Sequence, residues 1–219
     1  MSELNFTHSN GNKVKLTTPD TLAANKTFKL PGADGSSGQF LRTDGSGALS
    51  FATPTDTSGL AMADQWRWTT EFTQSNTQSY LTTTSNWERP DSKLGIGANP
   101  LGTGMTQDGG QFLFPSTGYY LIDFFASAKV GNDSCETFVF IQAEQNNNGY
   151  SDVARALFTI QNQCTPNYGT GSCQYLARIT NTSNDKIRFR LSNSGISVTW
   201  MGASDENRIC ATFLKLGDI

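Results

Sequence analysis

The sequence predicts an all-β protein, and three observations carry the prediction. It contains 21 glycines, and only 16% of its 219 residues are charged, against roughly 25% in typical soluble globular domains. Its apolar residues come in short runs separated by Gly, Pro, Asn, Asp and Ser, which is the pattern of strands joined by tight turns. No stretch of about eleven residues keeps an apolar period of three to four, so no segment clearly predicts a helix.

Residues 1–53 contain only very short apolar pieces, at 14–16, 28–30, 40–41 and 49–51, with turn residues between them. So few apolar side chains cannot offset backbone ordering costs of about 1–2 kcal/mol per residue. We therefore expect residues 1–53 to form a small, hairpin-rich attachment or intertwined region. Such a region is ordered by pairing with other chains or by docking onto something larger.

Residues 54–63 have the Pro, Thr, Ser and Gly content of a linker, and longer strands begin after them in the second expected domain, 64–219. The expected strands lie near 66–72, 79–83, 111–114, 119–128, 137–143, 153–160, 173–180, 185–191, 197–201 and 209–216. Among these segments only residues 152–160 could form a helix instead of a strand, because their apolar side chains also fit one face of a helix. We expect a strand there.

The faces of these strands differ. In residues 187–191 apolar and polar side chains alternate, which predicts that Arg188 and Arg190 face water. Residues 119–126 and 138–141 instead place apolar side chains on both faces, and an exposed apolar patch of this kind needs cover. The chain is too short for a third layer, so we expect a second subunit to supply it. The residues expected to pack in the core or between subunits are Tyr119, Tyr120, Phe124, Phe125, Phe138, Phe140, Phe213 and Leu216.

Catalysis has little support in the sequence. The single histidine, His8, lies in the polar N-terminal segment, which argues against His-dependent nucleophilic chemistry and His-ligated zinc. Two carboxylate pairs, Asp205 with Glu206 and Glu71 with Asp91, are candidates for glycan hydrolysis, but their spacing does not show that either pair meets in space. We expect no enzyme activity, no cofactor and no metal site.

Charge and hydropathy also limit the partners. A net charge of −3 and a sequence pI near 5.1 supply no basic field for a polyphosphate backbone. No apolar stretch approaches the length of a membrane span, and the first residues do not resemble a secretory signal. We expect neither a nucleic-acid partner nor membrane insertion.

The chain has too few cysteines to be stabilised mainly by disulfide bonds, so we expect buried thiols. The four cysteines are Cys135, Cys164, Cys173 and Cys210. A disulfide between Cys164 and Cys173, across a turn-rich loop, is the alternative.

Exposed loops are where a binding contact is expected, because loops at the end of a β-sandwich face outward. The residues nominated for such loop contacts are Tyr150, Asn167 and Tyr168.

The segment Phe114-Pro-Ser-Thr-Gly-Tyr-Tyr-Leu-Ile-Asp-Phe-Phe125 resembles the strand-turn-strand of the tumour-necrosis-factor and complement globular-head jelly rolls. The hairpin and strand at 181–191 and the final Ala211-Thr-Phe-Leu-Lys-Leu-Gly-Asp218 are similar to later parts of that superfamily. The resemblance covers about residues 64–219. It implies a C-terminal jelly-roll sandwich that forms the knob of a homotrimer.

Two further likenesses point to an origin. Ala63-Asp-Gln-Trp-Arg-Trp68 and Trp87-Glu-Arg-Pro90 resemble a knob in structural proteins of marine bacteriophages, and residues 27–51 are similar to a module of phage fibres. These likenesses imply a virion protein, assembled in the host bacterial cytoplasm, that is a short trimeric fibre, spike or capsid decoration. Residues 1–53 would bind capsid or tail proteins, with the knob outward. The alternative is a tail-fibre tip or adhesin that binds a host surface receptor or glycan.

Overall fold

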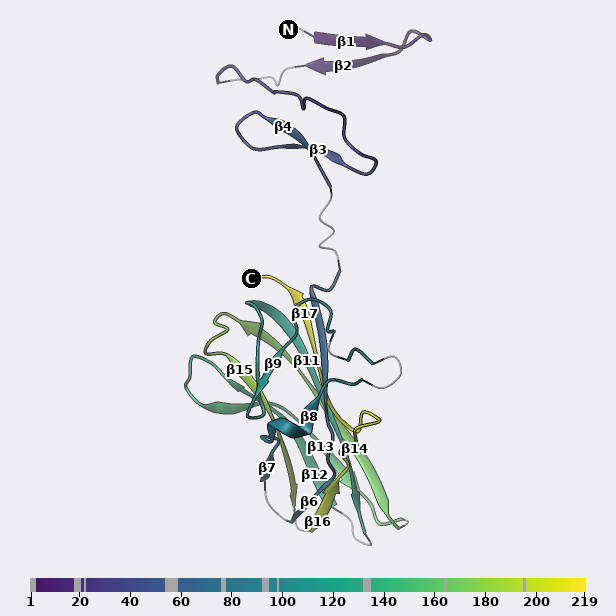
Figure 1. Cartoon of the computed structure of the whole chain (residues 1–219), viewed down its shortest axis with the longest axis vertical. Helices are drawn as coiled ribbons and strands as arrows, with labels where there is room; N and C mark the ends of the chain where they lie inside the picture. The colour runs from purple at the N-terminus through teal and green to yellow at the C-terminus, as the bar shows by residue number, and fades with distance from the viewer. Residues whose placement is uncertain are drawn as a thin grey trace. The chain divides into compact units, whose positions relative to one another are not determined.

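The computed structural model describes residues 3–17, 21, 23–53, 59–75, 78–91, 95–97, 99–131, 135–163, 165–194 and 196–219. The chain divides into two compact units, Met1–Asp56 and Thr57–Ile219, both drawn in Figure 1. The linker expected at 54–63 includes residues 54–58, which lie outside the described residues. The described elements are strands apart from one 3-10 turn, η1 (Thr84–Asn86), so the all-β prediction is confirmed.

The N-terminal unit consists of two small antiparallel hairpins. They are formed by β1 (Glu3–Thr7) with β2 (Lys13–Thr17) and by β3 (Phe40–Thr43) with β4 (Leu49–Ala52). The turn of the second hairpin is held by Asp44, whose Oδ1 accepts hydrogen bonds from the backbone N–H groups of Ser46 at 2.7 Å and Ala48 at 3.0 Å. Asp in a turn bonds to backbone a few residues on, which is why the Asp-Gly-Ser-Gly sequence closes a hairpin.

The C-terminal unit is a sandwich of two antiparallel sheets. The β11 sheet runs in the order β14, β11, β17, β5 and β8, with β16 also paired to β11 and β6 paired to β16. Its strands are β5 (Met62–Trp68), β6 (Phe72–Ser75), β8 (Trp87–Glu88), β11 (Gly118–Val130), β14 (Asn167–Ile179), β16 (Ser197–Trp200) and β17 (Ile209–Gly217).

The β12 sheet runs in the order β13, β12, β15, β10 and β9, and β7 also pairs with β15. Its strands are β7 (Gln78–Tyr80), β9 (Thr106–Asp108), β10 (Gln111–Leu113), β12 (Cys135–Glu144), β13 (Tyr150–Ile160) and β15 (Lys186–Ser194). The chain changes sheet from β10 to β11, β11 to β12, β13 to β14 and β14 to β15, so strands that are neighbours in a sheet are mostly distant in sequence. This is the connectivity of a jelly roll, as expected.

The core lies between the sheets and is rich in aromatic rings. Along β11 every second side chain is buried, because successive residues of a strand face opposite sides. Phe124 of β11 stacks on Phe189 of β15 with 4.3 Å between ring centroids. Phe112 of β10 lies 5.1 Å from Phe213 of β17 and 5.1 Å from Trp87. Residues far apart in the chain therefore close one core.

Strands β13 and β14 decide two alternatives that the sequence left open. Residues 152–160 form part of β13, a strand and not a helix. Most of the loop expected at 165–172 is strand instead. β14 begins at Asn167, and Asn167 pairs with Val130 at the end of β11. Gly169 and Gly171 lie in this added part of β14, where a Cβ on Gly171 would collide with Phe158 of β13 and a Cβ on Gly169 would collide with Ile160. Glycines that suggested a turn are therefore there for close packing between strands.

Candidate functional site

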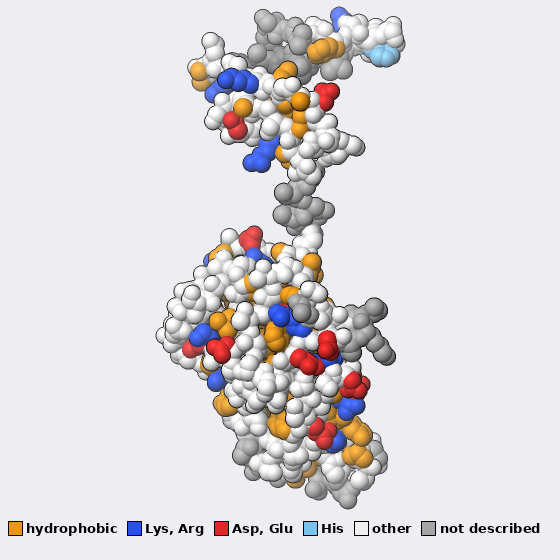
Figure 2. All heavy atoms as spheres, in the orientation of Figure 1, with side chains coloured by type: hydrophobic (Ala, Val, Ile, Leu, Met, Phe, Trp, Pro, Cys, Tyr) orange, Lys and Arg blue, Asp and Glu red, His pale blue; other side chains and the backbone are white. Residues whose placement is uncertain are grey.

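The outer face of the β11 sheet carries a row of apolar side chains. Leu121 of β11 pairs with Leu176 of β14 on one side and with Leu214 of β17 on the other, and Leu214 pairs in turn with Ala63 of β5. Leu176 is 59% exposed, and the other three are partly exposed. The row crosses four strands, on the face that does not contribute to the core. Figure 2 shows hydrophobic side chains at the surface of this unit.

A polar row lies next to this leucine row. Asp123 of β11 pairs with Gln174 on β14 and with Thr212 on β17, and Gln65 donates a hydrogen bond from Nε2 to Thr212 Oγ1 at 2.9 Å. Phe125 lies two residues beyond Asp123 on the same face and is partly exposed. The face is therefore mixed, with apolar contacts bordered by groups able to form hydrogen bonds.

The eight residues predicted to pack fall into two groups. Tyr120, Phe124, Phe140 and Phe213 are buried, at 5% exposure or less, within the single chain. Tyr119 at 40% and Leu216 at 52% are exposed, and Phe125 and Phe138 are partly exposed. Only this second group is available to another subunit. Leu121, Leu176 and Leu214 were not nominated, because only the pairing register shows that they share one row.

Phe140 is covered by side chains of its own chain. The guanidinium carbon of Arg190 lies 3.5 Å from the Phe140 ring centroid, and Arg190 Nη2 donates to Asp152 Oδ2 at 2.6 Å. Asp152 Oδ1 accepts from Gln142 Nε2 at 2.6 Å, and Gln142 Oε1 accepts from Arg188 Nε at 2.7 Å. The expectation that Arg190 faces water is wrong, since Arg190 is 6% exposed. A layer of side chains on the β12 sheet therefore covers Phe140 within the single chain.

Tyr150 belongs to the same layer. Arg188 lies between two aromatic rings, with its guanidinium carbon 4.4 Å from the Tyr80 ring centroid and 3.9 Å from that of Tyr150. Burial, with a smaller contribution from Glu144, raises the pKa of Tyr150 to about 12. The prediction that Tyr150 is an exposed loop residue is wrong, because it begins β13 and its ring stacks on Arg188.

Asn167 and Tyr168 lie at the start of β14, so the loop prediction is also wrong for them. Asn167 is 2% exposed. Its Nδ2 donates to the Gly131 carbonyl at 2.7 Å, and its Oδ1 accepts from the Gln163 N–H at 2.8 Å. Through these two bonds Asn167 connects the start of β14 to the backbone at Gly131 and Gln163. Tyr168 is 61% exposed on the opposite side of the strand.

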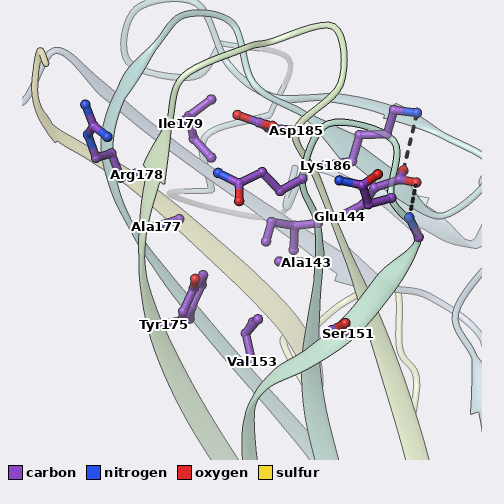
Figure 3. Close-up of a pocket in the computed structure, with 14 residues that line it drawn as sticks. Ala143, Glu144, Ser151, Val153, Tyr175, Ala177, Arg178, Ile179, Asp185 and Lys186 are labelled. Atoms are coloured by element: carbon purple, nitrogen blue, oxygen red, sulfur yellow. Dashed lines mark hydrogen bonds and ion pairs between the residues drawn. The ribbon is translucent and has the colours of Figure 1, made fainter.

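A pocket of about 340 Å³ lies where the two sheets separate, between β13 and β14. At the other end of these strands Phe158 fills the space over the two glycines of β14. At the pocket end, Ala143, Val153 and Ala177 supply small apolar side chains from three strands, together with Tyr175. Figure 3 shows Val153 and Tyr175 on facing strands, while Arg178 points away from them.

Three of the four charged residues that line this pocket are paired, and the fourth, Arg178, has no ion pair within the described part of the chain. Asp185 accepts backbone hydrogen bonds from Asn146, Thr180 and Asn181 at 3.3, 3.0 and 2.9 Å. Glu144 lies 3.5 Å from Lys186 Nζ and accepts the Gly149 N–H at 3.2 Å. The neutral polar side chains of the lining have no hydrogen bond within the described part of the chain; they are Gln145, Asn148, Ser151 and Tyr175.

Three of the four carboxylates considered for hydrolysis are held in ion pairs with basic side chains. Glu71 bonds Lys129 Nζ at 2.7 Å, and Asp91 bonds the buried Arg67 at 2.7 Å. Glu206 is paired with Arg208. His8 lies in the turn of the first hairpin, where Nδ1 accepts the Asn10 N–H at 3.3 Å. Among the described residues no cluster of His, Cys, Asp and Glu could hold a metal ion.

The thiols of Cys173 and Cys210 are free and buried, and Cys135 is buried as well. Burial is the largest cause that raises the pKa of Cys173 and of Cys210 to about 12, and nearby Asp123 adds to it. Cys164 lies outside the described residues, and the free Cys173 thiol does not support the alternative disulfide between them. Within the described ranges no helix has the length and apolar character that crossing a bilayer requires.

No protein-family model matches the sequence, and no curated protein matches it. Among solved structures, the chain is similar to Eiger TNF from S. frugiperda, with 14% identity and a TM-score of 0.48 over 74% of this chain and 96% of that chain. It is also similar to murine APRIL at pH 5.0, with 11% identity and a TM-score of 0.47 over 71% of this chain and 98% of that chain. Neither likeness carries an argument about activity, partner or origin.

Proposed function

We propose that this chain is a non-enzymatic structural protein of a bacteriophage virion, a short trimeric fibre, spike or capsid decoration. The C-terminal unit is its outward knob, and the N-terminal unit fixes it to capsid or tail proteins. The observation that carries the subunit contact is the leucine row of the β11 sheet. The virion assignment is supported by the sequence resemblance to phage structural proteins.

The leucine row favours association because a monomer would leave it in water. Leu121, Leu176 and Leu214 lie side by side on three adjacent strands, and exposed Tyr119 is two residues from Leu121 on the same face. Burying apolar surface gains roughly 25 cal/mol per Å², and contiguous exposed apolar patches mark interaction sites. Closed cyclic assembly of identical chains is the common way in which soluble proteins bury such a face.

The N-terminal unit exposes large apolar side chains of its own. Exposed fractions range from 39% to 76% for Phe28, Leu30, Phe40, Leu41 and Phe51. Two hairpins of this size bury too little surface for independent stability. Contact with other copies or with capsid or tail proteins would cover these side chains, which supports an attachment role.

Oligomeric state tests the knob. Light scattering on the full chain should give about three times the chain mass of 23.8 kDa. Leu176→Glu and Leu214→Glu should shift the protein to monomer, because a carboxylate in a buried apolar contact loses its hydration. Thr159→Glu, at an exposed position of β13, is the matched control and should stay trimeric. A monodisperse wild-type monomer would exclude the proposed trimer.

Particle composition tests the virion assignment. Quantitative mass spectrometry of purified phage particles should find the chain, and its copy number separates a capsid protein from a protein of the tail or a vertex. Absence of the chain from purified particles would overturn the assignment. The second candidate, a tail-fibre tip or host-binding adhesin, is favoured by the pocket between β13 and β14.

A further inference from the structure

We propose that the pocket between β13 and β14 binds a neutral saccharide, a mono- or disaccharide at the end of a glycan. This inference deepens the adhesin candidate and does not depend on the trimer. It rests on the size of the pocket, its apolar floor, its unpaired neutral polar groups and the internal pairing of its carboxylates.

The size and position of the pocket fit a small ligand. Its volume of about 340 Å³ is at the lower end of the roughly 300–1,000 Å³ that small-molecule sites occupy. Ser151 pairs with Ala143 at the pocket end of β13 and is exposed, so solvent reaches the pocket at this point. A ligand would enter beside Ser151, between the sheet edges.

The floor offers a surface for the C–H face of a sugar ring. Ala143, Val153 and Ala177 project small apolar side chains into the pocket from three strands. The partly exposed ring of Tyr175 lies beside Ala177 on the facing strand (Figure 3). Tyrosine combines an apolar ring with a polar hydroxyl, and a pyranose likewise presents C–H groups on its faces and hydroxyls at its rim.

The polar groups of the lining match hydroxyls. The side chains of Gln145, Asn148, Ser151 and Tyr175 can each donate and accept a hydrogen bond, as a sugar hydroxyl can. Because none is bonded within the described part of the chain, a ligand would not have to break protein contacts to reach them. Water would occupy these groups in the free protein and be replaced by ligand hydroxyls.

The charges argue against an ionic ligand. Asp185 is saturated by three backbone N–H groups, and Glu144 is held by Lys186 and the Gly149 N–H. Arg178 points away from the pocket (Figure 3). A cation would therefore find no unpaired carboxylate in the lining, and an anion would reach the unpaired Arg178 only outside the apolar floor, so a charged ligand that enters the pocket would lose hydration without compensation.

Saturation-transfer NMR on the full chain tests the proposal. The probes are the methyl glycosides of glucose, galactose, mannose and N-acetylglucosamine, with glucuronate and glucosamine as charged controls. We expect binding of at least one neutral glycoside and weaker binding of both charged sugars. Binding of no neutral glycoside, or preferred binding of a charged one, would overturn the proposal.

Substitutions in the pocket test whether the glycoside binds there. Ser151→Trp should abolish it by filling the mouth, whereas Thr159→Trp, at an exposed position outside the pocket on the same strand, should leave it unchanged. Tyr175→Phe keeps the ring and removes only the hydroxyl, so it should weaken binding roughly 2- to 10-fold, the loss of about one hydrogen bond. If thermal melting shows that Ser151→Trp does not fold, Tyr175→Phe still tests whether the glycoside binds in this pocket. Undiminished binding in Tyr175→Phe excludes this pocket.

A final arm separates this proposal from the trimer. Leu176→Glu changes the outer face of β14 and should leave glycoside binding intact whatever the oligomeric state. Loss of glycoside binding in this variant would place the glycoside on the outer face of β14 and would overturn the assignment to this pocket. Binding by a monodisperse wild-type monomer would support the saccharide site and exclude the trimer.

Discussion

Arg89 holds the buried carboxylate of Asp64 with two parallel hydrogen bonds, Nε to Oδ1 at 2.8 Å and Nη2 to Oδ2 at 2.9 Å. Asp64 Oδ2 also accepts the Met105 N–H at 2.7 Å and the Trp66 indole N–H at 3.0 Å. The Asp64 side chain has no exposed surface and that of Arg89 is 22% exposed. One carboxylate thus ties β5 to Arg89, which follows β8, and to Met105, which directly precedes β9.

Removal of this carboxylate should destabilise the knob strongly. Asp64→Ala leaves the Arg89 guanidinium and three N–H groups, those of Gln65, Met105 and the Trp66 indole, without their acceptor, and breaking a buried ion pair costs about 3–5 kcal/mol. Urea unfolding should show a loss of that size. Glu71→Ala, which removes an exposed pair with Lys129, should cost less than about 1 kcal/mol. Equal losses in the two variants would contradict the structural role of Asp64.

The closed end of the sandwich should depend on glycine. A Cβ on Gly171 would collide with the Phe158 ring, so Gly171→Ala should cost about 1–3 kcal/mol, the range for overpacking. Gly131→Ala is the control, because a Cβ there meets nothing within 4 Å. In a double-mutant cycle, Phe158→Ala should relieve the penalty of Gly171→Ala. Strict additivity would show that the two residues do not compete for space.

The Tyr80, Arg188 and Tyr150 stack should require arginine specifically. Arg188→Lys keeps the charge but loses the planar group between the rings and the Nε donor to Gln142, so we expect a loss of about 1–2 kcal/mol in unfolding free energy. Arg155→Lys on exposed β13 is the control and should be close to neutral. Equal stability of Arg188→Lys and wild type would show that charge alone suffices.

Stability should fall above about pH 9 because of the buried thiols. The pKa of Cys173 rises from 9.0 to about 12 on folding, so the unfolded chain releases this proton first. The stabilisation from the protonated thiol is complete below pH 9 and is lost as the pH rises towards 12. Urea unfolding between pH 8 and pH 11 should show the decline, with a shallower slope in Cys173→Ala.

The same pKa predicts slow alkylation. Iodoacetamide at pH 8 should leave Cys173 and Cys210 unmodified in native protein and modify both in urea, as checked by peptide mapping. Rapid modification of the native protein, or an unchanged slope in Cys173→Ala, would contradict the burial of these thiols.

Particular residues show where sequence reasoning succeeded. Ile187, Phe189 and Leu191 are buried as their alternation predicts, because period-2 patterning places every second side chain on one face. It failed for their neighbour Arg190. Local sequence gives the direction in which Arg190 points, outward from the sheet, but not the Phe140 ring and Asp152 carboxylate that cover it.

The turn-type residues at 165–172 predicted a loop where β14 begins, and that prediction is wrong. Gly169 and Gly171 are typical of a loop, yet they lie within a strand because they pair with Ala128 and Ala126 of β11. Side chains of β13 occupy the space above them, which is why these positions are glycine. The pocket could not be predicted either, since Ser151 and Tyr175 belong to strands of different sheets. Neither residue stands out in a sequence rich in Ser and containing 6 tyrosines.

Local propensity and short-range alternation were enough to predict the all-β class, the approximate position of most strands and the weak apolar pattern of the N-terminal unit. The tertiary structure decided the leucine row, the Arg190 cover, the Asp64 clamp and the pocket. Each of these depends on which strands pair and in what register, and a shift of a single residue would turn every side chain to the other face. Long-range pairing sets that register, so the two candidate surfaces became visible only in three dimensions.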